Sequence, residues 1–216
     1  MKGLLCLQGG HEFTSDCEEM DRDVLDMIGD GHVAVLAGAA RVGDDYDGAS
    51  GRARRHYESL GATVTILPDP RVDEAAALRA ASCDEIGLVV LPGGSPSNLR
   101  EVLSGSIGDR IVEMYRSGCA ISGASAGAMV LCEKMVRPDA RSGADVVDGL
   151  GLVAGMALPH WTRSGPRNWP IPDDIEVWGL PECGGVVIDA EGEPFAVGFG
   201  DPSRRVDGEW ITLDRR

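Results

Sequence analysis

The pentapeptide Gly-Ala-Ser-Ala-Gly at residues 123–127 is the one G-x-S-x-G motif in the sequence. An apolar segment, CAIS at 119–122, precedes it, and a run of small and apolar residues that favours a helix follows it. In such a strand-turn-helix context the motif presents a serine on a sharp turn, where only very small neighbours fit. We therefore predict that Ser125 is a nucleophile. The competing interpretation is a close-packed turn of small residues without chemistry.

A second turn that suits the same chemistry is Leu-Pro-Gly-Gly-Ser at residues 91–95, which ends the apolar segment 85–91. A glycine pair at the end of a strand leaves backbone N–H groups uncovered, and such groups stabilise the oxyanion that forms when a serine attacks a carbonyl. We predict an oxyanion hole made by the N–H of Gly93 or Gly94 and the N–H of Ala126. Glycine pairs are also common in ordinary turns, and we interpret the pair at 9–10 in that way.

A serine nucleophile needs a base, and His160 is the one histidine that follows Ser125 in the chain. It comes after a strand-like segment at 149–158, while His11, in the loop after the first predicted strand, is the second candidate. A carboxylate must orient the imidazole, and Glu182 is favoured because it lies between two short predicted strands in a stretch poor in charge. The rival carboxylates lie in a polar segment where solvated acids are expected: Glu133, Asp139, Asp145 and Asp148.

The cysteines and the remaining histidines lack the spacing of a metal site. No CxxC pair and no HExxH motif occurs among the six cysteines and four histidines, so we expect reduced, mostly buried thiols. We expect His32 and His56 to be structural or exposed. The glycine-rich turns also lack the further glycines of a dinucleotide fingerprint and the lysine of a phosphate loop. The sequence therefore predicts no metal and no organic cofactor.

Short apolar segments alternate with helical patterns from the N-terminus to about position 135. The predicted strands are 2–7, 33–40, 63–67, 85–91 and 119–122, and the predicted helices are 17–28, 48–60, 73–82, 97–104 and 107–117. Strands that are apolar almost throughout are typical of a parallel sheet covered by helices on both faces. The predicted fold class is α/β, a doubly wound, mostly parallel sheet sandwiched by helices. Ligands of such folds bind at the carboxyl ends of the strands.

The pattern changes after residue 133. We expect a polar loop at 134–149 and then a β-rich C-terminal part that completes or edges the sheet. Its predicted strands lie near 175–179, 185–189, 194–199 and 209–213. Neither a linker nor an internal repeat is evident, so we expect residues 1–216 to form a single domain.

An excess of acidic residues narrows the choice of partners. The sequence has 35 Asp and Glu against 20 Lys and Arg, a formal net charge of −15, whereas nucleic acids and anionic membranes require a basic face. No apolar stretch approaches the roughly 18 residues of a transmembrane helix, and the N-terminus lacks the apolar core of a signal peptide. We therefore expect a cytoplasmic protein that binds neither nucleic acid nor a membrane.

The motifs together resemble those of peptidase family S51, which includes aspartyl dipeptidase (peptidase E) and cyanophycinase. The segments that carry the resemblance occur in family order along nearly the entire chain: GGHEF (9–13), Asp21-Arg22, LGA (60–62), LPGGSPSNL (91–99), GASAGAM (123–129), GLGL (149–152), PHW (159–161) and GLPE (179–182). The family has a class I glutamine amidotransferase-like fold and a Ser-His-Glu triad in this chain order. The resemblance thus implies Ser125 as nucleophile, His160 as base and Glu182 as the acid that orients it.

The resemblance further implies a small peptide or isopeptide substrate, with Asp-X dipeptides as one option, and a monomer or a homodimer. Cations bind the acidic side chain of the substrate in the dipeptidase, and here Arg163 and Arg167 follow His160. We predict that at least one of these arginines lines the pocket. Ser95-Pro96 departs from the residues that usually follow the family's glycine pair. The alternative function is non-catalytic ligand binding on the same fold, while a thiol enzyme of the glutaminase type is disfavoured because residue 125 is a serine.

Overall fold

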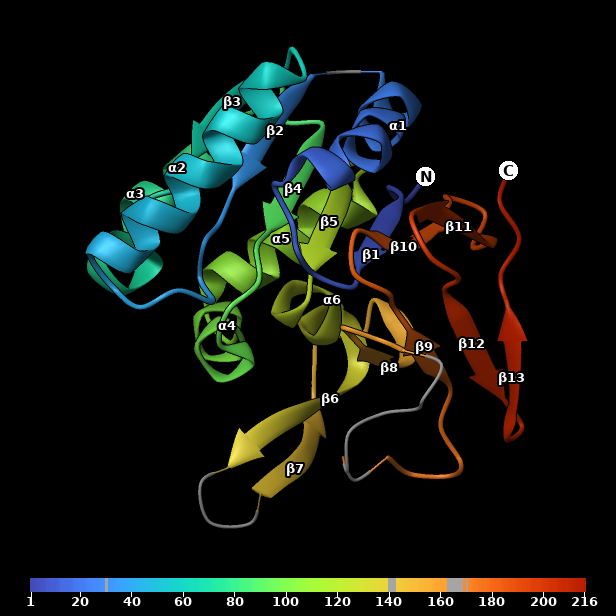
Figure 1. Cartoon of the computed structure of the whole chain (residues 1–216). Helices are drawn as coiled ribbons and strands as arrows, with labels where there is room; N and C mark the ends of the chain where they lie inside the picture. Colours follow the sequence, from blue (N-terminus) through green and yellow to red (C-terminus); the bar gives the residue numbers. More distant parts are fainter. Residues whose placement is uncertain (30, 140–142, 163–168, 170) are drawn as a thin grey trace.

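The computed structural model contains two β-sheets, and strands alternate with helices along its first half (Figure 1). The structure describes residues 1–29, 31–139, 143–162, 169 and 171–216. The first sheet has seven strands, which are in spatial order β11 (Pro194–Gly198), β10 (Gly184–Ile188), β1 (Leu5–Gln8), β5 (Ala120–Ala124), β4 (Leu88–Leu91), β2 (His32–Val35) and β3 (Thr63–Ile66).

Five strands of this sheet, β1, β5, β4, β2 and β3, pair in parallel. Strands β10 and β11 extend the sheet beyond β1 in antiparallel pairings. The doubly wound, mostly parallel architecture is therefore confirmed, and the C-terminal part completes the sheet as predicted. Strand β2 ends at Val35, before the end of the predicted segment 33–40, and the chain then turns toward the helix at Asp44–Ser59.

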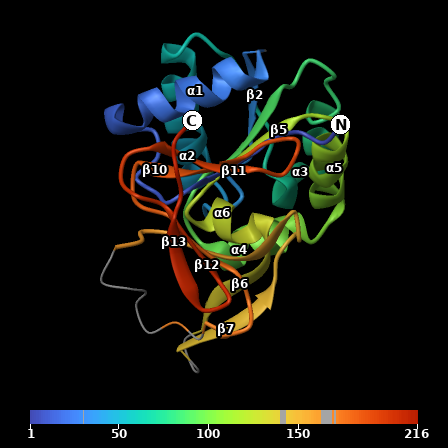
Figure 2. The same cartoon turned by 90° about the vertical axis from the view of Figure 1, so that its right-hand side faces the viewer.

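Helices cover both faces of the first sheet. The 3₁₀ helix η1 (Ser15–Cys17), α1 (Glu18–Ile28) and α2 (Asp44–Ser59) lie on one face. The other face is covered by α3 (Pro70–Ala80), α4 (Pro96–Leu103), α5 (Ser106–Arg116) and α6 (Ala126–Leu131). Strand β1 shows the reason, since Cys6 packs into the core beneath α1 and α2 while Leu5 and Leu7 pack into the opposite core. Figure 2 shows α1 and α5 on opposite sides of the strands.

The second sheet was not expected as a separate element. Its six strands are in spatial order β13 (Glu209–Thr212), β12 (Ser203–Val206), β9 (Val177–Gly179), β8 (Val153–Leu158), β6 (Cys132–Asp139) and β7 (Gly143–Asp148). Residues from β6, β8 and β9 share a continuous core with α4, α5 and α6. Strands β9 and β13 match predicted segments, whereas β12 was not predicted.

The prediction of a polar loop at 134–149 is wrong, because β6 and β7 form an antiparallel hairpin that projects from the body of the molecule (Figure 1). The charged residues that suggested a loop instead pair across the two strands. Lys134 Nζ lies 2.6 Å from Asp148 Oδ1, and Arg137 Nη2 lies 3.3 Å from Asp145 Oδ2. Opposite charges at directly opposed strand positions stabilise such pairs. In the part of the chain that the structure describes, no helix is long and apolar enough to cross a membrane.

Candidate active site

The carboxyl ends of three neighbouring strands meet at one edge of the first sheet. The register aligns Gln8 of β1 with Ala124 of β5, and Leu91 of β4 with Gly123 of β5. The loops that follow these strands therefore begin side by side. They contain the glycine-rich turn at 9–13, Ser125, and the glycine pair at 93–94.

Ser125 occupies the sharp turn between β5 and α6. Its backbone angles are φ 49° and ψ −105°, a conformation that few non-glycine residues adopt. Both outer glycines of the motif are required by close packing. A β-carbon on Gly123 would lie 2.5 Å from the carbonyl carbon of Gly127, and one on Gly127 would lie 2.1 Å from the carbonyl oxygen of Leu91. Glycine at both positions therefore allows the sharp strand-to-helix turn at residues 123–127, which we call the elbow.

His160 and Glu182 reach the elbow from the second sheet. Strands β8 and β9 are parallel neighbours with Leu158 opposite Gly179, and the two side chains follow their carboxyl ends. His160 Nε2 lies 3.1 Å from Ser125 Oγ, and His160 Nδ1 lies 2.9 Å from Glu182 Oε1. The structure thus brings the three predicted residues into one hydrogen-bonded chain, with about half of the His160 and Glu182 side chains exposed. Their catalytic roles stay a prediction.

The segment Gln8–Glu12 contacts every other part of this site. The carbonyl oxygens of Gln8, Gly9 and Gly10 accept hydrogen bonds from the N–H groups of Ser125 (2.9 Å), His160 (2.9 Å) and Cys183 (3.0 Å), in that order. The segment therefore positions the backbone of Ser125, of His160, and of the residue next to Glu182.

Glu12 is a site residue that sequence reasoning missed, because the glycine pair before it was interpreted as a turn. The N–H of Gly93 donates a 2.8 Å hydrogen bond to Glu12 Oε1. A β-carbon on Gly93 would lie 2.8 Å from Glu12 Oε1 and 3.2 Å from Ser125 Cβ, so the Glu12 carboxylate and Ser125 border the same small space. The available signal was the carboxylate in GGHEF, two residues after a strand-ending glycine pair.

The other predicted oxyanion donors lie at the same edge. Ala126 is the first residue of α6, a position at which the N–H has no acceptor within the helix. Gly94 has φ +141°, and a β-carbon there would lie 2.9 Å from the carbonyl oxygen of Ala39. Of these predicted donors, the N–H of Gly93 is bonded to Glu12 in this structure.

The departure at Ser95-Pro96 has a local structural explanation. Ser95 is the N-cap of α4, and its hydroxyl oxygen accepts a 3.2 Å hydrogen bond from the N–H of Asn98. Pro96 occupies the first helical position, where its missing N–H removes no hydrogen bond. These two residues begin a helix directly after the glycine pair.

Backbone strain is concentrated at this edge. Six described residues other than glycine have positive φ, and five of them belong to the loops of the site: His11, Phe13, Ser125, His160 and Cys183. Such conformations cost about 1–3 kcal/mol each and cluster at functional sites. This clustering is an indication of function that does not depend on residue type.

The remaining candidates lie elsewhere or beyond the described part of the chain. His11 is exposed, with Nδ1 3.9 Å from Cys183 Sγ. Asp145 and Asp148 belong to the ion pairs of the hairpin. Arg163 and Arg167 lie outside the described residues.

A buried polar cluster lies behind the elbow. Asp21 is 1% exposed and accepts hydrogen bonds from Gln8 Nε2 (2.8 Å) and from the Tyr57 hydroxyl (3.2 Å). His56 Nε2 lies 2.7 Å from its other carboxylate oxygen. Burial, together with the nearby Asp21, raises the pKa of the Cys6 thiol to about 12. This cluster links α1 and α2 to the end of β1, and it makes His56 a buried structural histidine, one of the two outcomes expected for it.

Comparisons with known proteins agree with this fold. The model of peptidase family S51 matches residues 4–173. A solved structure described as a peptidase from an acI-B1 Actinobacterium has a TM-score of 0.73 at 20% identity, covering 99% of this chain and 98% of that one. A solved structure described as a putative peptidase E protein from Listeria monocytogenes EGD-e has a TM-score of 0.63 at 16% identity, covering 93% of this chain and 100% of that one. No curated protein shows significant similarity to the sequence.

Proposed function

The chain belongs to peptidase family S51, and from this membership and the geometry of the elbow we propose that it is a serine peptidase acting on small peptide or isopeptide bonds. The observation that carries the proposal is the hydrogen-bonded chain Ser125–His160–Glu182, built on a strained strand-to-helix turn. A serine, a histidine and a carboxylate in this order of contacts are the parts of a nucleophilic triad, whatever their order in the sequence.

In the proposed reaction Ser125 Oγ attacks the carbonyl carbon of the scissile bond while His160 Nε2 accepts the hydroxyl proton. Glu182 accepts the Nδ1–H of the ring and stabilises the imidazolium that forms. The tetrahedral intermediate collapses when the C–N bond breaks and the leaving amine takes the proton from His160. A water molecule, deprotonated by His160, then hydrolyses the acyl-serine ester and releases the acid.

The oxyanion of the intermediate is stabilised by the N–H of Ala126 and by the N–H of Gly93 or Gly94. Because Glu12 holds the Gly93 N–H in this structure, its carboxylate has to leave that donor if Gly93 is the group used. A carboxylate that borders the same space as the nucleophile's β-carbon also suits a positive group of the substrate, and the α-ammonium of a peptide lies two bonds from the first carbonyl carbon. We therefore assign Glu12 to binding the free N-terminus of the substrate.

The preferred side chain at the scissile bond is a separate question. The net charge of −15 repels an acidic substrate at long range, so a preference for an acidic residue requires a cation in the pocket. A bidentate arginine that binds the substrate carboxylate at close range outweighs this repulsion. Arg163 and Arg167 remain the proposed cations. A peptide panel with Asp, Asn, Leu or Lys before the scissile bond tests them on the wild type, Arg163→Ala and Arg167→Ala. A preference for Asp that collapses in one variant supports this assignment, and indifference to charge in the wild type refutes it.

The proposal as a whole is tested with a fluorophosphonate probe and intact-mass analysis. We expect a single adduct on the wild type that is absent from Ser125→Ala, with Ser122→Ala, three residues earlier on β5, as the control that retains it. Slow or absent labelling of a folded wild type contradicts the proposal and favours non-catalytic ligand binding on this fold.

A further inference from the structure

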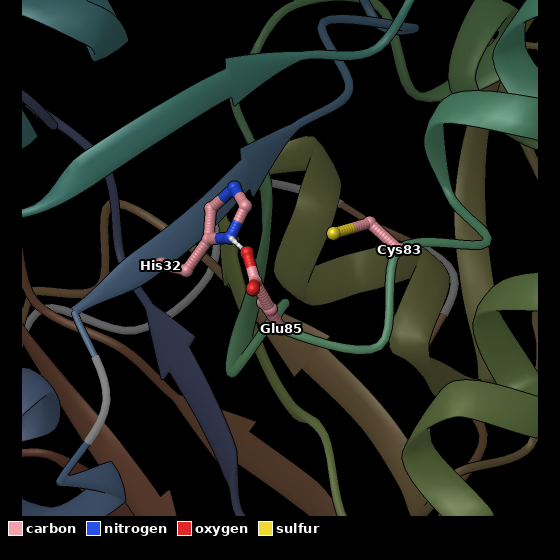
Figure 3. Close-up of side chains that lie close together, drawn as sticks. All are labelled: His32, Cys83 and Glu85. Carbon is pink, nitrogen blue, oxygen red and sulfur yellow. Dashed lines mark ion pairs between the residues drawn. The ribbon is translucent and has the colours of Figure 1, made fainter.

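Three potential metal ligands converge at the opposite end of the first sheet. His32 is the first residue of β2, and Cys83 and Glu85 lie in the turn that connects α3 to β4. One ligand atom from each residue lies within 4.8 Å of the other two. Figure 3 shows His32 and Glu85 pointing toward one another, with the sulfur of Cys83 facing the pair. The spacing along the sequence conceals this group, because His32 and Cys83 come from different strand-helix units.

Backbone pairing fixes the relative position of the two segments. The N–H of Gly87 donates a 2.9 Å hydrogen bond to the carbonyl oxygen of His32, and the N–H of Ile86 donates one of 3.4 Å to the carbonyl oxygen of Cys83. The end of the turn therefore lies against the start of β2, directly before β4 begins. The three side chains depend on this pairing for their proximity, and only the Glu85 side chain is largely exposed.

The environment of His32 prepares it to bind a metal through Nδ1. Its Nε2 lies 2.9 Å from the hydroxyl of Thr65 on β3. When Nε2–H donates to that hydroxyl, the lone pair of the neutral ring is on Nδ1, the atom that faces Glu85. Metal-binding histidines generally donate their second N–H to such an outer partner, which fixes the tautomer and the orientation of the ring.

The separations fit a cation better than a direct hydrogen bond. His32 Nδ1 and Glu85 Oε2 are 3.9 Å apart, which exceeds hydrogen-bond distance. In a tetrahedral zinc site with bonds of about 2.0–2.3 Å, ligand atoms are roughly 3.3–3.8 Å apart. Modest shifts, mainly in the exposed Glu85 side chain, thus close the site around an ion.

We propose that His32, Cys83 and Glu85 form a binding site for a divalent transition metal, with zinc as the preferred ion. A thiolate and an imidazole favour zinc over magnesium or calcium, which prefer oxygen ligands alone. Three protein ligands leave a fourth position for water. Since the site is at the amino ends of the strands and Ser125 is at their carboxyl ends, the metal links β2 to the turn before β4 and takes no part in hydrolysis.

The test is a titration of the reduced, metal-free protein with Co²⁺, whose bond to a thiolate gives a near-ultraviolet charge-transfer band. We expect the band to saturate at one equivalent of Co²⁺, to be abolished by Zn²⁺ and to be unaffected by Mg²⁺. It should be absent from Cys83→Ser and unchanged in Cys119→Ser, which removes another half-buried thiol. A wild type without the band, or a band that persists in Cys83→Ser, overturns the proposal.

A second pair of variants examines the outer partner of His32. Loss of such a partner weakens metal affinity by about 10- to 100-fold, so Thr65→Val should weaken Co²⁺ binding by that factor. Thr63→Val, two residues earlier on the same strand, should not weaken it. Equal affinities in the two variants contradict the assignment of Nδ1 as the ligand atom. Removing the metal with a chelator should lower the melting temperature and leave the rate of fluorophosphonate labelling unchanged, which separates this proposal from the proposed peptidase activity.

Discussion

Gly10 is predicted to control the position of His160, the proposed catalytic base. It has φ +123°, and a β-carbon there would lie 2.4 Å from His160 Cε1 and 3.0 Å from His160 Nδ1. Carbon atoms in contact are normally about 3.5–4.0 Å apart, so in Gly10→Ala the ring has to move by about 1 Å. The ring moves rather than the chain because the backbone of His160 is held by its hydrogen bond to the carbonyl oxygen of Gly9.

Such a movement disrupts the hydrogen-bonded chain. His160 bridges Ser125 at 3.1 Å and Glu182 at 2.9 Å, and the shift takes the ring beyond hydrogen-bond distance of at least one of them. Misplacement on this scale costs about 100-fold in rate, which corresponds to about 2.7 kcal/mol of transition-state stabilisation. We expect kcat/KM on a small peptide and the rate constant of fluorophosphonate labelling to fall together by about that factor.

The matched control is Gly43→Ala. Gly43 also has positive φ (+87°), but a β-carbon there meets no atom within 4 Å. This variant measures the cost of backbone strain alone, and the melting temperatures of both variants establish that they are folded. A folded Gly10→Ala whose labelling rate is within about threefold of the control would falsify the argument, because the steric contact would then have no effect on the base.

Three other contacts lead to predictions of their own. Glu12→Gln should lower kcat/KM about tenfold or more for peptides with a free N-terminus and leave N-acetylated peptides unaffected; equal losses on both would contradict the assignment of Glu12 to the α-ammonium. Asp21→Ala should lower the free energy of unfolding in urea by about 3–5 kcal/mol, because it leaves buried donors without an acceptor, whereas the exposed Asp26→Ala should change it by less than about 0.5 kcal/mol. The Cys6 thiol, with its pKa raised from 9.0 to about 12 by burial, loses its proton first in the unfolded chain. The free energy of unfolding should therefore fall by up to about 1.4 kcal/mol per pH unit as the pH rises from 9.0 to about 12. The fall should be shallower in Cys6→Ala.

The first sheet was predictable because its strands carry an unambiguous signal. Parallel strands buried on both faces are short apolar runs. Gly61 and Gly118, both with positive φ, lie just after helices α2 and α5 and mark where these helices end. The elbow was predictable for a similar reason, since G-x-S-x-G requires small residues on both sides of Ser125. Local pattern and tertiary structure agree at these positions.

The second sheet was less predictable because its stability depends on pairing partners far away in the sequence. Lys134 and Arg137 resemble solvated loop residues until Asp148 and Asp145 are placed opposite them. Glu12 was missed for the same reason, since its partner Gly93 is 81 residues away. A local pattern such as GGHEF can place a carboxylate near the end of a strand, but it does not identify the distant partner of that carboxylate.

The pairing of β1 with β10 has a consequence for the synthesis of the chain. Leu5 pairs with Ile121 of β5 on one side and with Ile188 of β10 on the other, so at about 5–20 residues per second the ribosome needs roughly 10–40 s to supply the second of these partners. During this interval β1 has an open edge, and such edges promote aggregation. Ser125 emerges 35 residues before His160, and Glu182 follows His160 by a further 22 residues. A growing polypeptide therefore carries the proposed nucleophile before its proposed base and acid, and the triad that we propose for cleavage cannot form until Glu182 has been synthesised.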